Sequence, residues 1–182
     1  MPKLNKTCYI IRRSKLYLSN DALKWCTLFF FHSVMSYGLI FWGNSTHSKC
    51  VFKLRKMAIR IIMGARNNVS CTEFFKLLKI LPLSVQYIYS LVMFVVNNRY
   101  LFLDNAEFYT IKTRNSYNLH PPLPHLTKYQ KGVHYAGIRV FNHLPTSIKS
   151  TVKETKMFKK ALKTFLLDNS FYSSDEYFNF KK

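Results

Sequence analysis

Acidic residues are scarce in this 182-residue sequence: eight Asp and Glu stand against 28 Lys and Arg, so the formal net charge is +20. Between residues 1 and 100 the acids are Asp21 and Glu73 alone, against fifteen Lys and Arg. So few carboxylates argue against clustered-acid catalysis and hard-metal sites, which need several of them. A strongly cationic chain attracts dense negative charge, as on nucleic-acid backbones or anionic membranes. The composition therefore indicates binding before catalysis.

Glycine, proline and paired cysteine are also in short supply. Five glycines and six prolines are too few for a linker-rich chain or a many-turned β protein. The four cysteines form no Cys-x-x-Cys pair, which argues against a zinc ribbon and a secreted disulfide scaffold and favours free thiols in a reducing compartment. No apolar run with a cleavage site follows the basic N-terminus. We therefore expect an intracellular protein, in the nucleus or the cytoplasm.

Residues 25–42 contain no Lys, Arg, Asp or Glu. Eighteen such residues are close to the shortest length of a membrane-spanning helix, which is about 17 residues. His32, Ser36 and Gly38 interrupt the apolar character and are typical of a bend between helices. A buried hairpin or kinked helix is therefore favoured, and a membrane span is the alternative.

Apolar periodicity and capping residues predict a mainly α fold. The helices are expected at residues 6–18, 21–41, 48–63, 70–80, 82–97 and 154–167. Residues 1–100 would form a helical bundle, 101–150 an irregular Pro/Tyr-rich connector with short strands such as 133–141, and 151–182 a C-terminal helix followed by a frayed tail. Apolar residues make up 48% of the chain and aromatic residues 16%, which is unlike a disordered sequence.

The segment 48–63 gives the clearest amphipathic pattern. Lys49, Lys53, Lys56 and Arg60 fall within about 60° of one another on a helix, in a row about 16 Å long. The opposite side of the helix is apolar and carries Val51, Leu54, Ala58, Ile61 and Ile62. This row is either a solvated surface or a phosphate-contacting face. The shortage of acids elsewhere favours the second interpretation.

Further cations near this row and in the connector extend the candidate nucleic-acid-binding set. They are Arg55, Arg66, Arg114, Lys131 and Arg139. In the connector the cations alternate with tyrosines, and stacking aromatics with backbone-contacting cations are typical of single-strand binding. Packing of the same tyrosines onto the helices is an equally good interpretation.

The sequence offers no motif for catalysis or for a cofactor. It contains no Gly-x-Gly phosphate loop, and its Asp and Glu are isolated apart from Asp175 and Glu176. His120 and His125 flank a Pro-Pro-Leu-Pro segment at a spacing that suits two metal ligands, but no cysteine pair stands near them. We predict no catalytic residue, no metal and no cofactor, and hence no enzyme activity of the chain on its own.

A series of segments resembles one family in order along the chain. They are FHSVMSYGLIFWG (31–43), LRKMAIRIIMGA (54–65), LLKILPL (77–83), TRN (113–115), GVHYAGIRVFNHLP (132–145) and FKKALKTFLL (158–167). Together they are similar to the region that follows the catalytic palm in reverse transcriptases of jockey-like non-LTR retrotransposons of arthropods. The likeness extends from about residue 5 to residue 177. One departure is Ile111, where the family usually has Tyr.

This resemblance implies the thumb and adjoining C-terminal region of an RNA-directed DNA polymerase. The palm's paired metal-binding aspartates and the endonuclease domain are outside these 182 residues, as in a fragment of a transposable element. Such a fragment would bind RNA or an RNA–DNA template–primer through contacts with phosphates. An intact polymerase core, supplied by a separate protein molecule, would be its partner in any polymerisation. Two alternatives stay open: a membrane-associated basic protein anchored by residues 25–42, and a non-functional relic.

Overall fold

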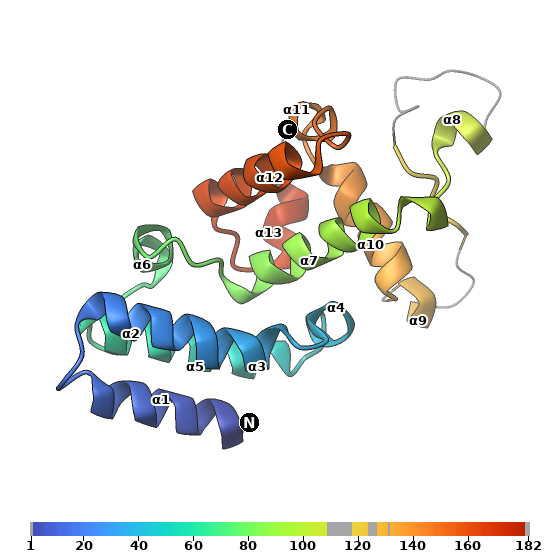
Figure 1. The fold of residues 1–182 in the computed structure, drawn as a ribbon. Helices are drawn as coiled ribbons and strands as arrows, with labels where there is room; N and C mark the ends of the chain where they lie inside the picture. Colours follow the sequence, from blue (N-terminus) through green and yellow to red (C-terminus); the bar gives the residue numbers. More distant parts are fainter. Residues whose placement is uncertain (1, 109–117, 124–126, 131, 181–182) are drawn as a thin grey trace.

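The computed structural model describes residues 2–108, 118–123, 127–130 and 132–180. Over these ranges the fold is mainly α, as expected, and the structure forms no strand there (Figure 1). The nearest approach to a sheet is an isolated antiparallel bridge between Asp104 and Leu119. The mainly helical fold class is therefore confirmed.

The first half of the chain packs as a layer of nearly parallel rods. Its elements are α1 (Pro2–Ser14), α2 (Asn20–Cys26), the π-helix η1 (Thr27–His32), α3 (Ser33–Ser36), α4 (Leu39–Trp42) and α5 (Ser48–Met63). In Figure 1, α2, η1 and α3 form one continuous rod that lies in front of α5 and above α1. Leu4, Cys8 and Ile11 are buried at helical spacing on α1, where that helix packs against α5 and η1.

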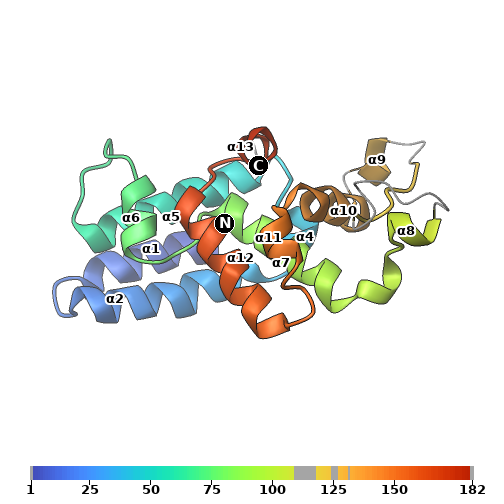
Figure 2. The same cartoon turned by 90° about the horizontal axis from the view of Figure 1, so that it is seen from above.

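The second half is built around one apolar helix. Its elements are α6 (Thr72–Leu77), α7 (Leu83–Asn97), the 3-10 helix η2 (Arg99–Leu101), α8 (Asn105–Phe108), α9 (Thr127–Gln130), α10 (Val133–His143), α11 (Thr146–Lys149), α12 (Thr155–Asn169) and α13 (Ser174–Asn179). α7 contacts α4, α5, α10, α12 and α13 (Figures 1 and 2). An apolar sequence on all sides suits this central position.

Helices α5 and α7 follow their sequence signals closely. α5 has the predicted bounds, and Gly64 ends it with a φ of 67° and an N–H that bonds back to the Arg60 and Ile61 carbonyls. A glycine in the left-handed region is a common helix terminator because it has no side chain to clash. α7 begins directly after Pro82, as expected.

The prediction of a single helix over residues 21–41 is wrong in detail, because the structure divides this stretch into α2, η1, α3 and α4. Leu23, Phe31 and Met35 are all buried on one side of the rod. In an uninterrupted α-helix Leu23 and Phe31 would be offset by about 80°. The wider turn of η1 removes this offset, so both reach the core. The rod ends at the predicted bend, where Gly38 has a φ of 60°.

The strand expected over residues 133–141 is also wrong, because these residues form α10. Gly137, Ile138, Val140 and Phe141 are buried at helical rather than alternating spacing. A Cβ atom on Gly137 would lie 2.8 Å from Val95 Cγ2, so glycine permits α10 to approach α7 closely. Packing against α7 thus selects the helix over the extended form that Val and Phe favour locally.

Within the described part of the tail, residues 171–180 carry the short helix α13, contrary to the expected fraying. Ser173 accepts a hydrogen bond from the Glu176 N–H at 3.1 Å, and the Glu176 carboxylate accepts one from the Tyr172 N–H at 2.6 Å, which together start α13. Tyr177 is buried, and its hydroxyl donates to the Val140 carbonyl at 2.9 Å. The cap and the buried ring hold α13 against α10.

The expected three-part division at residues 100 and 150 stays a prediction. One contiguous cluster of buried apolar side chains includes residues from all three parts, from Leu4 to Tyr177. A smaller cluster under α6 contains Ile59 and Phe75. The core therefore continues across both expected boundaries.

Candidate nucleic-acid interface

Lys49 and Lys53 are exposed on the outer side of α5. They lie one helical turn apart, so their backbone positions are about 6 Å apart along the axis. Among the described residues no acid is within ion-pair distance of either ammonium group. The two charges therefore face solvent without compensation.

Lys56 belongs to the same row but is half-buried. Its Nζ lies 4.9 Å from the centre of the Phe52 ring and 6.0 Å from that of Tyr172. These distances suit cation–π contacts, which hold the ammonium while its stem covers apolar surface. Lys56 thus adds positive charge at a fixed place, with less freedom to reach a ligand than Lys53.

Arg60 also continues the row, but it holds the loop that follows α5. Its Nε and Nη2 both donate to the Val69 carbonyl, at 2.9 and 2.8 Å. A guanidinium has five N–H donors, so three remain for other partners. Arg60 is half-buried, whereas Arg66 in the loop is exposed.

Arg55 was expected among the nucleic-acid-binding residues, and its position in the structure contradicts this. Its side chain is buried, with the residue 3% exposed, so it forms no part of the outer face of α5. Arg55 Nη1 lies 3.1 Å from Met35 Sδ, and the guanidinium is 6.0 Å from the centre of the Phe75 ring. On the helix Arg55 is about 100° from Lys56, which turns it toward α3 and α6. Sequence adjacency to the row did not show this burial.

The remaining expected contacts do not join the α5 row in the described part of the chain. Arg139 is exposed on α10, with its guanidinium 4.6 Å from the centre of the Phe178 ring. α10 packs on α7, and Figures 1 and 2 place it away from α5. Arg114 and Lys131 lie outside the described residues.

Helix α12 carries a second group of exposed cations that the expected binding set left out. They are Lys156, Lys159, Lys160 and Lys163. The signal was in the sequence, since the buried residues Phe158, Leu162 and Leu166 share one side of the same helix. In Figure 1, α12 lies above α7 and α5 lies below it, so the two groups of cations are on different helices on either side of α7.

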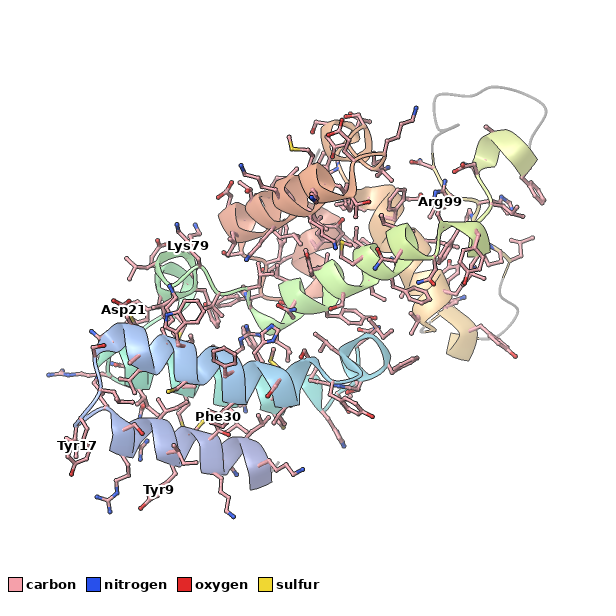
Figure 3. All side chains as sticks on the ribbon, in the orientation of Figure 1. Tyr9, Tyr17, Asp21, Phe30, Lys79 and Arg99 are labelled. Carbon is pink, nitrogen blue, oxygen red and sulfur yellow. The ribbon has the colours of Figure 1, made fainter. Side chains whose placement is uncertain are left out.

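The outer side of the α2–η1–α3 rod is apolar and uncovered. Trp25, Phe29 and Phe30 are 60%, 70% and 63% exposed. Figure 3 shows Phe30 on this rod, with Tyr17 pointing away from the bundle at the α1–α2 turn. The favoured buried interpretation of residues 25–42 is therefore only partly correct. In the described part of the chain, no helix combines the length and the apolar character that a membrane crossing requires.

Residues capable of catalysis are not gathered in the described ranges. No group of three or more His, Cys, Asp or Glu there could hold a metal ion. Asp104 pairs with Arg99, and His120 stacks on Phe108 with ring centres 3.8 Å apart. His125 lies outside the described residues. The four cysteines are free thiols, and burial raises the pKa of Cys8 and Cys71.

Comparisons with protein-family models, with curated proteins and with solved structures find no match to this chain. The likeness to retrotransposon polymerases therefore depends on the quoted sequence segments alone.

Proposed function

We propose that this chain is the thumb-like C-terminal part of a non-LTR retrotransposon RNA-directed DNA polymerase. It binds RNA or an RNA–DNA template–primer through phosphate contacts and performs no catalysis on its own. The single structural observation that supports this function is the uncompensated pair Lys49 and Lys53 on the outer side of a well-packed helix. The resemblance of the sequence segments supplies the polymerase context, and an intracellular location in nucleus or cytoplasm belongs to the same proposal.

The mechanism is electrostatic positioning. Lys49 and Lys53 contact phosphates, while Lys56 and Arg60, which are held by the protein, strengthen the positive potential along the row. Phosphate contacts fix register and orientation but read no bases, so binding is independent of sequence. A palm supplied by an intact polymerase would perform the chemistry on the nucleic acid held in this way.

A second candidate, attachment to an anionic membrane surface, is favoured by the exposed aromatics Trp25, Phe29 and Phe30. Aromatic rings beside cations are typical of helices that lie in the membrane interface. The same exposed area also supports the relic alternative, since large uncovered apolar patches promote aggregation.

The test measures binding of a labelled RNA–DNA hybrid by fluorescence anisotropy. Lys49→Glu with Lys53→Glu is expected to weaken binding about tenfold or more for every sequence, because two phosphate contacts become repulsions. The matched control, Lys3→Glu with Lys6→Glu, changes two exposed lysines of α1 and gives the same net charge. Equal losses in both variants would contradict a specific α5 face.

Sedimentation with vesicles of anionic lipid separates the second candidate from the first. Phe29→Ser with Phe30→Ser should leave hybrid binding unchanged if α5 is the interface. Loss of vesicle binding in this variant, with no hybrid binding in the unaltered chain, would favour the membrane function instead.

A further inference from the structure

An open groove runs along α12 where α11 packs against it (Figures 1 and 2). It holds about 500 Å³, which is within the range of about 300–1,000 Å³ that is typical of ligand-binding clefts. Along α12 the groove extends from Met157 to Asp168, a rise of about 16 Å at 1.5 Å per residue. The groove is therefore about three helical turns long.

Apolar side chains form the floor of this groove. Ile148 of α11 is buried beneath it, and Ala161 and Phe165 of α12 are half-buried along it. Met157, at the N-terminal end of α12, lines the same floor and is 55% exposed. The Phe165 ring packs on the ring of Phe171, with the two centres 6.3 Å apart, so the tail of the chain holds this wall in place. The floor is thus preformed, and part of it faces water.

One edge of the groove is cationic. Lys160 lines the groove, and Lys156 and Lys163 lie within about 60° of it around α12, on the side away from the floor. All three lysines are exposed, and among the described residues no acid is within ion-pair distance of their ammonium groups. Asp168 also lines the groove, at the C-terminal end of α12. An occupant therefore meets positive charge along one edge and a negative charge at one end.

We propose that this groove binds an acidic amphipathic helix of a partner protein. Apolar side chains at positions i, i+4 and i+7 of that helix rest on the floor, which is the usual way in which a groove recognises a helix. These anchors span about 10 Å, so the groove is long enough for all three. Acids along one side of the partner helix face Lys156, Lys160 and Lys163, and a basic residue faces Asp168.

A second copy of this chain does not supply such a helix from its described residues. Its adjacent acids, Asp175 and Glu176, lie in the first turn of α13, which is six residues long. Tyr177 of the same helix is buried, and its hydroxyl donates to the Val140 carbonyl, so α13 already packs on its own chain. The occupant is therefore a different protein. The groove is separate from the cations of α5, and this proposal does not depend on the proposed function.

The experiment measures binding of a fluorescent peptide to the full chain by anisotropy. The peptide has about 15 residues, enough to form a helix, with Leu at positions i, i+4 and i+7 and Glu along one side. The control peptide has the same composition in an order that breaks the apolar stripe, so its net charge is equal. The ordered peptide should bind about tenfold or more tightly than the control, because it alone places three leucines on the floor.

Matched variants of the protein separate the groove from the general positive charge. Lys160→Glu should weaken binding of the ordered peptide about tenfold or more, because an acid then faces the acids of the peptide. Lys159→Glu gives the same net charge on the same helix but lies outside the groove, and should weaken binding by less than about threefold. Met157→Ser changes an exposed side chain of the floor and should weaken binding about threefold or more.

Equal binding of the ordered and control peptides would overturn the proposal, because charge alone would then explain the affinity. Equal losses in Lys160→Glu and Lys159→Glu would overturn it as well. An RNA–DNA hybrid that loses affinity in Lys160→Glu, while the ordered peptide does not, would assign this edge of α12 to nucleic acid instead.

Discussion

The two halves of this helical protein treat their apolar side chains differently. In the second half α7 is covered on its sides by α10, α12 and α13, and Leu91, Leu162 and Leu166 are fully buried. In the first half the α2–η1–α3 rod buries one side, while Trp25 and Phe29 on the other side face solvent. The second half therefore closes its own core, and the first half presents surfaces that a partner can use.

Within the first half, the exposed apolar side chains and the exposed cations of α5 lie on different sides. The apolar surface lies on the α2–η1–α3 rod and the row that contains Lys49 and Lys53 lies on α5, on the opposite side of the layer (Figure 2). An exposed apolar patch and a row of uncompensated cations are each a kind of surface through which proteins make contacts.

The largest expected change in the free energy of unfolding comes from removing a phenylalanine ring in each half of the molecule. Phe158→Ala should lower the free energy of unfolding by about 3–5 kcal/mol, because the ring is fully buried and leaves a cavity. Phe30→Ala removes the same kind of ring from the uncovered surface and should change the free energy of unfolding by less than about 0.5 kcal/mol. Chemical denaturation of both variants measures the difference. Equal losses would show that the first half is closed as well.

A smaller effect is expected where α10 meets α7. Gly137→Ala should destabilise the protein by about 1–3 kcal/mol, because the new Cβ lies 2.8 Å from Val95 Cγ2. Adding Val95→Ala makes room, so the double variant should lose less than the sum of the two single losses. Strict additivity in denaturation experiments would argue that the close approach is absent in solution.

Tyr177→Phe should cost about 1 kcal/mol, since the Val140 carbonyl loses its hydroxyl donor while the packing of the ring stays. Burial raises the pKa of Tyr177, so the hydroxyl stays protonated and remains a donor at neutral pH. Tyr17→Phe, at a tyrosine that is 87% exposed, is the control and should be neutral. Amide exchange in α10 that is unchanged in Tyr177→Phe would contradict this role of α13.

The smallest expected change is in the pH dependence of the free energy of unfolding, through His32 in the first half. His32 has a lowered pKa in the folded state, so the unfolded state binds more protons between that pKa and the ordinary value of 6.5. The free energy of unfolding should therefore fall as the pH drops through 6.5. Denaturation at pH 7.5 and 5.5 should show a larger loss in the unaltered protein than in His32→Gln. Equal losses would place His32 in open solvent.

Local signals predicted the parts of the fold that local chemistry decides. Gly64 and Pro82 set the limits of α5 and α7, and the spacing of Lys49 and Lys53 predicted an outer cationic side. The burial of Arg55 and the helical state of residues 133–141 depend on neighbours distant in sequence, namely Met35 and α7. The register change at η1 likewise becomes visible only when its buried side is known.

The central proposal is that the exposed cations of α5 bind nucleic-acid phosphates, and the dependence of affinity on salt tests it most directly. With Lys49 and Lys53 as the phosphate contacts, the logarithm of the affinity for an RNA–DNA hybrid should fall with the logarithm of salt concentration with a slope of about −1.4 to −1.8 or steeper. Lys49→Glu with Lys53→Glu should make this slope shallower by about 1.4 to 1.8. An affinity that does not change with salt, or an equal slope in the variant, would contradict the proposal.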